Sequence, residues 1–447
     1  MSASVEAAPV TVRVQRRGAG RVKTALLVAL VLLYPFHHVF GPLNVSAGDL
    51  VVAVVGVALL ANFAARDIPF PYYVLPAFAM LTIIVASITL NTMVDETFFD
   101  LIRSPVETAK FLAAAMWMMA SFWLLYDDFP HRIVVFCLAG ITLATAFASL
   151  TVVENVFRHV PRPSGPFENP NIYGNYLLLN TFLVFGVSNL LTERAAVAHR
   201  RGLLLKYHTL AWPVVIPLLL LGALSTGSRG TLLGFCVGLP FALRWRWPRV
   251  TPRRIVFGIL ALFVLGGAVW WFLDQHPFVM VRLTRTFEGD GPNIDDRLAL
   301  WRAAREAFYT HPLLGIGYGQ FGAYAQHVQG LKPMVTHETY LAAAAELGIA
   351  GLLVFLWLLA VVMRDAWRIR IYPGSGLSRA GFAYVLATTV QGLTNNVDQF
   401  RALWLAFGIV AAMRVHAARR RAPPAVGLSA SPDPGAWIIR GGAGGGR

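Results

Sequence analysis

Apolar runs of about 20 residues recur along most of the chain, and they limit its fold more than any other feature. Each run is long enough to cross the hydrocarbon core of a bilayer, about 30 Å thick, as an α-helix. Backbone polar groups cannot stay unpaired in lipid, and no strand-like alternation indicates a barrel, so an all-α polytopic membrane protein is expected. The twelve predicted spans are 24–40, 47–65, 70–90, 108–127, 132–155, 171–191, 209–225, 229–245, 255–274, 337–363, 379–396 and 400–416.

The composition agrees with a membrane protein and argues against a soluble enzyme. Only 14% of the residues are charged and 56% are hydrophobic, whereas soluble proteins carry about 25% charged residues. The net charge of +15 does not require a nucleic-acid partner, and none is predicted, because polytopic proteins collect arginine in cytoplasmic loops. Both cysteines, Cys137 and Cys236, fall inside apolar runs, so we expect neither a disulfide framework nor a zinc site.

The basic residues indicate which ends of the spans face the cytoplasm. With a cytoplasmic N-terminus, the arginine-rich loops between alternate spans lie on the same side as both termini. The basic leader 11–23 also resembles the start of a signal peptide, but the first span fits this topology without cleavage. The predicted divisions are a cytoplasmic tail at 1–23, spans one to nine at 24–274, an external loop at 275–336, spans ten to twelve at 337–416 and a disordered cytoplasmic tail at 417–447.

The external loop between the ninth and tenth spans contains a stretch with helical periodicity. Residues 296–309 place Leu298, Trp301 and Ala304 on one side, as in an amphipathic helix that lies against the membrane or the helical bundle. Pro312 and the glycines that follow it should end this helix in a turn-rich segment.

Four groups of polar residues are predicted to lie at the external ends of the spans. This topology is derived from the apolar spans and the basic loops, and therefore independently of these four groups. Several guanidiniums at a membrane surface suit an anionic ligand such as phosphate or pyrophosphate. Each arginine alone also has a simpler explanation, because interfacial arginines snorkel to lipid headgroups or cap helix ends. The groups are the segment 162–171 with Arg162, Asn169 and Asn171, the turn 225–230 with Arg229, the loop helix with Arg297 and Arg302, and the segment 336–341 with His337, Glu338 and Tyr340.

His337 is the candidate base of this group. It starts a helix, where the positive end of the dipole disfavours the imidazolium and keeps a neutral ring that can accept a proton. A lone interfacial histidine also serves packing or hydrogen bonding. Glu346, lower on the same helix, could bind substrate or pair with a neighbouring helix. The polar turn 395–401 could form a rim of the same cavity or simply end an exposed hairpin.

The chain lacks the usual motifs for nucleotide or metal chemistry. It contains no P-loop motif, and Leu341 stands where a zinc protease motif starting at His337 needs its second histidine. No cluster of cysteine and histidine suggests a metal or haem site. We therefore predict no cofactor and no metal, and chemistry outside the membrane would need a substrate that arrives already activated.

Taken together, these external motifs resemble the O-antigen ligase and polymerase superfamily. The resemblance covers roughly residues 160–360 by motif and the whole chain by topology. Its motifs are Gly-Pro-Phe-Glu-Asn-Pro-Asn at 165–171, Ser-Arg-Gly at 228–230, Arg297 with Trp301, His-Pro-Leu-Leu-Gly-Ile-Gly-Tyr-Gly at 311–319, His-Glu-Thr-Tyr-Leu at 337–341 and Glu-Leu-Gly-Ile-Ala-Gly at 346–351.

The resemblance implies a multi-pass protein of a Gram-negative inner membrane, with a large periplasmic loop over a cavity open to the periplasm. It implies a donor glycan on undecaprenyl pyrophosphate and, in ligases, a lipid A-core oligosaccharide as acceptor, joined by a metal-independent, inverting reaction. Arg229 and Arg297, with Arg162, would bind the pyrophosphate. His337 would be the general base, and Glu338 would orient it or replace it.

Three alternatives stay open on the sequence. A polymerase would join one lipid-linked repeat to another with the same donor and arginines, and a related transferase would glycosylate protein. Two features favour the ligase. The motif His-Glu-Thr-Tyr occurs once, at the start of the tenth span, and the chain has one large external loop, 275–336, rather than two comparable basic ones. A lipid-linked glycan transporter would instead have discontinuous helices and ionisable residues near mid-membrane, of which Glu346 is the main example here.

Overall fold

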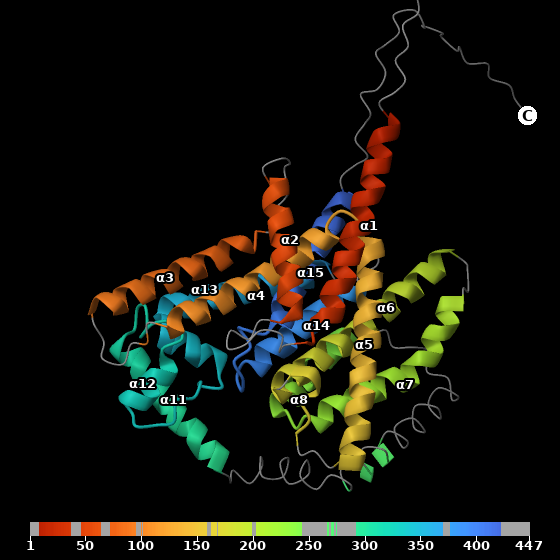
Figure 1. Ribbon diagram of the computed structural model, residues 1–447. Coiled ribbons are helices and arrows are strands. Elements are labelled where there is room, and N and C mark those ends of the chain that lie inside the picture. The colour runs from red at the N-terminus through yellow and green to blue at the C-terminus, as the bar shows by residue number, and fades with distance from the viewer. Residues whose placement is uncertain are drawn as a thin grey trace, which may run out of the picture.

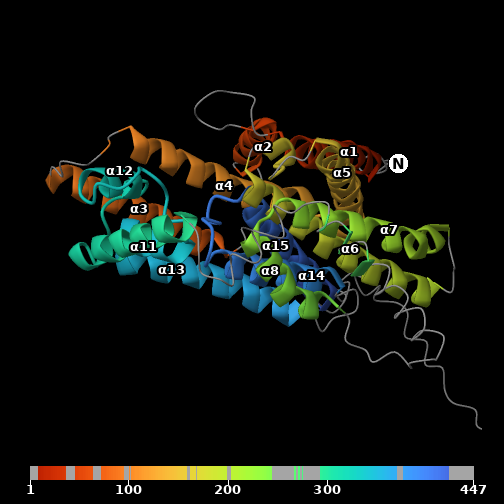
Figure 2. The same cartoon turned by 90° about the horizontal axis from the view of Figure 1, so that it is seen from below.

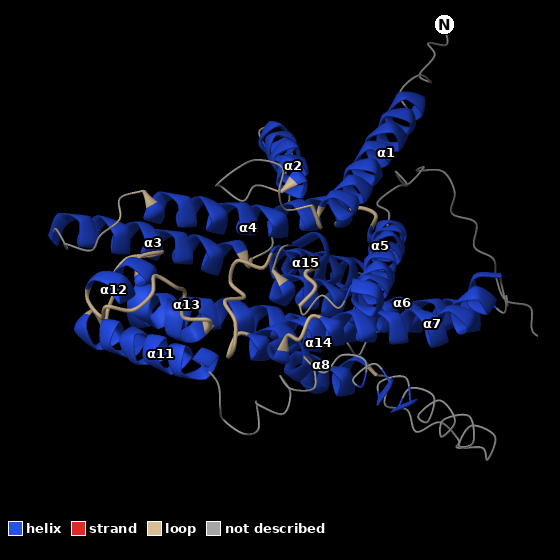
Figure 3. Ribbon diagram, turned by 60° about the horizontal axis from the view of Figure 1, so that its bottom comes forward, coloured by secondary structure: helices blue, strands red, loops and turns tan. Residues whose placement is uncertain are grey.

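The described part of the chain is helical throughout, with no strand, as the sequence predicts (Figure 3). The computed structural model describes residues 9–36, 46–63, 72–94, 100, 102–158, 162–167, 169–198, 203–243, 266–267, 270–271, 274, 292–369 and 376–421. Its helices are α1 (Pro9–Leu33), α2 (Ala47–Phe63), α3 (Val74–Val94), α4 (Arg103–Leu125), α5 (Phe129–Arg158), the 3₁₀ turn η2 (Gly165–Phe167), α6 (Pro170–Ala198), α7 (Leu203–Ser225), α8 (Arg229–Ala242), α11 (Pro292–Thr310), α12 (Phe321–His327), α13 (Thr339–Ile369), α14 (Gly376–Gln391) and α15 (Arg401–Arg421).

Eleven of the twelve predicted spans overlap a described helix, and the ninth, 255–274, lies largely outside the described residues. By length and composition, five described helices could cross a membrane: α3, α4, α5, α13 and α15. The chain is thus a multi-pass membrane protein, while the total of twelve spans stays a prediction. Helix α1 begins at Pro9 and α15 continues to Arg421, while the predicted division into tails, spans and external loop stays a prediction.

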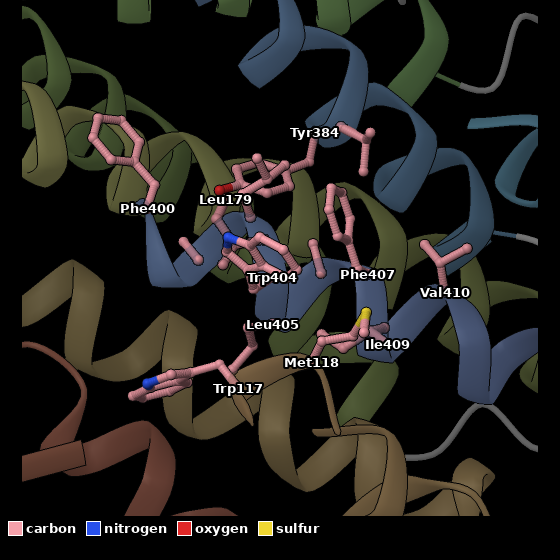
Figure 4. Packing of buried hydrophobic residues seen from close by; sticks show 14 of the residues in the cluster. Trp117, Met118, Leu179, Tyr384, Phe400, Trp404, Leu405, Phe407, Ile409 and Val410 are labelled. Carbon is pink, nitrogen blue, oxygen red and sulfur yellow. The ribbon is translucent and has the colours of Figure 1, made fainter. Parts of the chain in front are cut away.

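The core is centred on α15, which packs against α4, α6 and α14 (Figure 4). Trp404 and Phe407 of α15 and Trp117 of α4 are fully buried. Gly408 allows the close approach of α4, because a Cβ at this position would overlap the Ser121 hydroxyl. Small residues at such crossings let backbones pack tightly where lipid supplies no hydrophobic driving force.

Different polar contacts hold the two ends of the bundle. At one end, which we call the site end, Arg401 Nη2 lies 2.7 Å from Asp49 Oδ2 and Arg401 Nε donates to Asp49 Oδ1 over 2.8 Å. Trp117 Nε1 donates to the same carboxylate over 2.6 Å. At the opposite end, Lys23 Nζ lies 3.0 Å from Asp127 Oδ2. The starts of α2 and α15 therefore meet at the site end, as the predicted alternation of helix directions requires.

The helix α13 is interrupted at Gly348, and residues 312–317 fill the interruption. Gly348 has φ 64° and ψ −164°. Ile349 N–H donates to the Pro312 carbonyl over 2.8 Å, and Gly317 N–H donates to the Glu346 carbonyl over 3.1 Å. The loop backbone thus satisfies groups on both sides of the break, as non-helical backbone at membrane depth requires. This insertion fixes the position of residues 317–320.

The predicted loop helix exists as α11 and lies against α12 and α13 (Figures 1 and 2). Its buried face differs in part from the predicted one. Leu300, Ala304 and Ala307 are at most 3% exposed, whereas Leu298 is 40% exposed. Of the predicted side, Ala304 therefore faces the packed cluster and Leu298 does not, and the alternative that Leu298 faces the membrane stays a prediction.

Candidate functional site

Arg162, Arg229 and Arg297 come from three distant parts of the chain and lie close together at the site end. Burial lowers the pKa of the Arg297 guanidinium, and the nearby charges of Arg229 and Arg162 lower that pKa further. Burial and the charge of Arg229 also lower the pKa of Arg162. Like charges have such effects only at short range, so these three residues form one group, which we call the basic cluster.

The basic cluster has no acidic partner among the residues that the structure describes. Within the same set of residues, the buried Nε atoms of Arg162 and Arg229 lack a hydrogen-bond partner. Arg297 Nη1 donates to the Thr394 carbonyl over 3.4 Å. Partly buried guanidiniums without a counter-ion are costly, and an anion that accepts bidentate hydrogen bonds would remove much of that cost.

The start of α8 positions Arg229. Ser228 caps the helix, since its hydroxyl accepts from Thr231 N over 3.4 Å and from Thr231 Oγ1 over 2.9 Å. Gly230 lets the helix start pack on the turn after α14, because a Cβ there would lie 2.5 Å from Asn395 Nδ2. The positive end of the α8 dipole therefore points toward the same region as the guanidiniums and adds to its attraction for anions.

His337 lies beside the basic cluster in a strained backbone conformation. Its φ is 54°, and it is the only residue other than glycine with positive φ in the described part of the chain. Strain of this kind is retained at functional sites when neighbouring contacts impose it. Trp301 Nε1 of α11 donates to the Thr336 carbonyl over 3.0 Å, which fixes the preceding residue. Burial and the charge of Arg297 lower the pKa of His337 below its usual value.

Glu338 caps the first turn of α13. Its carboxylate accepts from Tyr340 N over 3.2 Å and also accepts from Leu341 N. Burial raises the pKa of Glu338, although these two hydrogen bonds oppose the rise. A carboxylate occupied by two backbone donors is well placed to fix the start of α13, and therefore the adjacent His337.

A cavity of about 550 Å³ opens at the site end, and His337 is part of its wall. Asn169 and Asn171, from the start of α6, also line it, and Asn169 Oδ1 accepts from Asn171 N over 2.8 Å. The volume lies within the range of about 300–1,000 Å³ that is usual for ligand pockets. His337 thus lies between this cavity and the basic cluster, whose three arginines are not themselves among the lining residues.

Two other predicted site residues lie away from the cavity. The hydroxyl of Tyr340 donates to the Thr389 carbonyl of α14 over 2.6 Å, so Tyr340 joins two helices. Arg302 is exposed on α11. The structure therefore brings together His337, Arg162, Arg229 and Arg297. Asn169 and Asn171 line the same cavity as His337, whereas Tyr340 and Arg302 do not.

The wall formed by α4, α13 and the loops around them carries acidic and amide groups. We call Glu107, Tyr318, Glu346, Asp398 and Gln399, all of which line the cavity, the carboxylate pocket. Burial and the nearby carboxylates of Asp398, Glu346 and Glu107 raise the pKa of Tyr318. Burial, with a contribution from Glu107, raises the pKa of Asp398 to about 6.

Sequence analysis found this second wall only in part. The turn 395–401 was expected to form either a rim or a simple hairpin, and Glu346 was expected to bind substrate or pair with a helix. Glu107 and Tyr318 were not predicted as site residues. In the sequence, Glu107 is an acidic residue near the start of an apolar helix, and Tyr318 lies inside a glycine-rich loop. Without the fold, both are only weak indications of a functional site.

Comparison with known proteins agrees with the geometry. Residues 214–356 match the family model described as O-antigen ligase. The matched segment includes Arg229, Arg297, His337 and Glu338, whereas Arg162 precedes it. A search among curated proteins gives no match. The match over residues 214–356 supports the resemblance to the O-antigen ligase and polymerase superfamily.

Proposed function

We propose that this protein is an O-antigen ligase of lipopolysaccharide biosynthesis. It transfers a glycan from undecaprenyl pyrophosphate to a sugar hydroxyl of lipid A-core, at the periplasmic face of a Gram-negative inner membrane. The observation that carries this proposal is the basic cluster, which lacks acidic partners among the described residues and adjoins His337. A site of this kind suits a pyrophosphate leaving group next to a proton acceptor. Membrane lipids surround the helices and the polyprenyl chain.

In the proposed reaction, the acceptor hydroxyl oxygen attacks the anomeric carbon of the donor glycan. The imidazole of His337 takes the hydroxyl proton as the new carbon–oxygen bond forms. The bond between the anomeric carbon and the pyrophosphate oxygen breaks, and its electron pair leaves with undecaprenyl pyrophosphate. The guanidiniums of Arg229 and Arg297, supported by Arg162, stabilise the charge that grows on that oxygen. Attack from the opposite face inverts the anomeric centre, and no metal or cofactor takes part.

Glu338 acts in this scheme as a positioning residue. Its carboxylate accepts two backbone N–H groups of α13, so it is less available than the imidazole for proton transfer. By capping the helix it holds His337 at the cavity wall. Asn169 and Asn171 line the cavity and are candidates for contacts with substrate hydroxyls. Neither the exposed Arg302 nor the interhelical Tyr340 is given a role in substrate binding.

The alternative activities predict different products. A polymerase with the same donor would lengthen the lipid-linked glycan and would ignore lipid A-core. A transporter would use a discontinuous helix, and the break of α13 at Gly348 beside Glu346 is the observation in its favour. However, residues 312–317 form hydrogen bonds with the backbone on both sides of that break, so the break has a structural explanation. The transferase is therefore the better supported function.

Glycolipid transfer with purified protein tests the proposal. The assay contains synthetic lipid-pyrophosphate glycan and lipid A-core, with and without a chelator. Glycan coupled to lipid A-core in both conditions is expected. A lengthened donor without coupling would identify a polymerase, and donor movement across vesicles without any new glycosidic bond would identify a transporter.

Replacing Arg229 by glutamine should lower kcat/KM for transfer by about 10²–10³-fold, the effect usual for one donor that stabilises transition-state charge. Arg229→Lys should recover part of the rate, because it restores the charge without the bidentate geometry. The matched control is Arg368→Gln, which removes an exposed arginine at the other end of α13. Equal rates for wild type and Arg229→Gln would remove Arg229 from the mechanism.

The pH dependence of transfer should follow the neutral form of His337. Because burial and Arg297 lower its pKa below 6.5, the imidazole is still mostly neutral at pH 6.5 and reaches half-protonation only at more acidic pH. We expect kcat/KM to decline on the acidic side as one proton binds, with a midpoint below pH 6.5. Because Asp398 titrates near 6, the same profile is measured for Asp398→Asn. The acidic decline should persist there, and a decline centred above pH 6.5 in the wild type would contradict the assignment.

A further inference from the structure

The carboxylate pocket contains buried polar atoms that the described part of the protein leaves without a hydrogen bond of good geometry. Tyr318 is 5% exposed, and its hydroxyl makes no hydrogen bond of good geometry among the described residues, although the polar side chains of Gln399 and Asp398 lie near it. Oδ1 of Asp398 is likewise buried without such a hydrogen bond. Both residues line the cavity. Leaving such groups unpaired costs free energy, and a ligand that both donates and accepts hydrogen bonds would satisfy them.

The remaining walls of the pocket are held firmly. Glu107 Oε1 lies 2.7 Å from Lys110 Nζ, and Glu107 Oε2 accepts from Gln399 Nε2 over 2.7 Å. Gly319 has φ 80° and would place a Cβ 2.7 Å from Glu107 Cγ, so the loop backbone packs directly on this side chain. Glu346 Oε1 accepts from Phe321 N over 3.2 Å. Groups that are fixed in this way can recognise a ligand without rearrangement.

The kinds of groups in the pocket indicate the class of ligand. Three carboxylates and an amide offer mostly acceptors, and Arg103, Lys110 and Arg401 line the same cavity and offer donors, so these walls suit an uncharged ligand that both donates and accepts hydrogen bonds. A sugar ring suits the pocket, because each hydroxyl can donate to a carboxylate and accept from Tyr318 O–H. Phe167 and Phe400 also line the cavity and offer apolar faces for the C–H side of a ring. The pyrophosphate, which is an anion, is better suited to the positively charged basic cluster near His337.

We propose that the carboxylate pocket binds the acceptor sugar ring through its hydroxyl groups. This inference rests on the proposed glycosyl transfer and adds the site from which the acceptor presents its hydroxyl to His337. The two parts of the site then bind different substrates. The basic cluster binds the anionic part of the donor, and the carboxylate pocket binds the uncharged, hydroxyl-rich part of the acceptor.

Direct binding tests the pocket independently of any reaction. Core oligosaccharide released from lipid A is titrated into the full-length protein in detergent, without donor, and Kd is measured by calorimetry. Tyr318→Phe and Asp398→Asn should each weaken binding at least about tenfold, because each leaves a ligand hydroxyl without its partner. The matched controls are Tyr309→Phe and Asp128→Asn, at side chains that are 71% and 53% exposed. Unchanged Kd in both pocket variants would overturn the proposal.

Steady-state kinetics then separate acceptor from donor. The proposal predicts a raised KM for lipid A-core and an unchanged KM for the lipid-pyrophosphate glycan in Tyr318→Phe. A rise in the donor KM alone would mean that the pocket holds donor sugars, and it would overturn the assignment to the acceptor. If no transfer occurs at all but the pocket variants still weaken oligosaccharide binding, the proposed function fails while the sugar site stands.

Discussion

Replacing His337 by asparagine should lower glycan transfer by about 10²–10⁴-fold, the usual contribution of a positioned general base. Asparagine tolerates the left-handed conformation that the φ of 54° requires, so this variant removes the base without disturbing the backbone. Alanine removes the same base but resists positive φ, so His337→Ala combines the chemical loss with strain. A comparison of the two variants therefore separates catalysis from folding.

The measurement is initial rate with both substrates saturating, together with donor binding. We expect His337→Asn to keep the wild-type Kd for lipid-pyrophosphate glycan, because the basic cluster is intact. The matched control, His131→Asn, changes a histidine whose side chain is 69% exposed outside the site, and it should transfer at the wild-type rate. Transfer undiminished in His337→Asn would exclude His337 as the base and leave the cluster of arginines as the main source of rate enhancement.

That Arg229 and His337 lie at the same end of the bundle could be predicted, because it depends on simple rules. The positive-inside rule sets the direction of each apolar helix, and that direction places the starts of α8 and α13 at the same end. Arg229 and His337 lie at or next to those starts. The rules do not give the order of helices in the bundle, so only the structure shows that Arg162 and Arg297 reach the same place.

Features that depend on contacts between distant segments could not be predicted. Residues 337–363 read as one continuous apolar span, and nothing in their periodicity marks the break at Gly348 or the segment that fills it. The carboxylate pocket joins Glu107 of α4 to Gln399 after α14, nearly 300 positions later in the chain. Glu338 has the residue type of a catalytic acid or base, and only its two hydrogen bonds reveal it as a helix cap.

Replacing Gly348 by alanine is expected to destabilise the protein severely and to abolish transfer with it. Two effects add. The combination of φ 64° and ψ −164° is essentially restricted to glycine and costs about 1–3 kcal/mol for other residues. A Cβ would also overlap the Leu313 backbone and lie 2.6 Å from Leu314 N. The 312–317 segment would have to leave the break, which exposes the backbone groups of Pro312, Ile349 and their neighbours.

Gly330 supplies the control that distinguishes strain from collision. It has the same φ of 64°, but a Cβ there would meet no atom within 4 Å. Gly330→Ala should therefore cost only the left-handed penalty of about 1–2 kcal/mol, whereas Gly348→Ala carries the collision as well. Thermal unfolding in detergent, followed by tryptophan fluorescence, should show a much larger fall of Tm for Gly348→Ala. Equal shifts in the two variants would mean that the inserted segment yields easily. The loop that carries Tyr318 and Gly319 would then be positioned by its contacts with α4 rather than by α13.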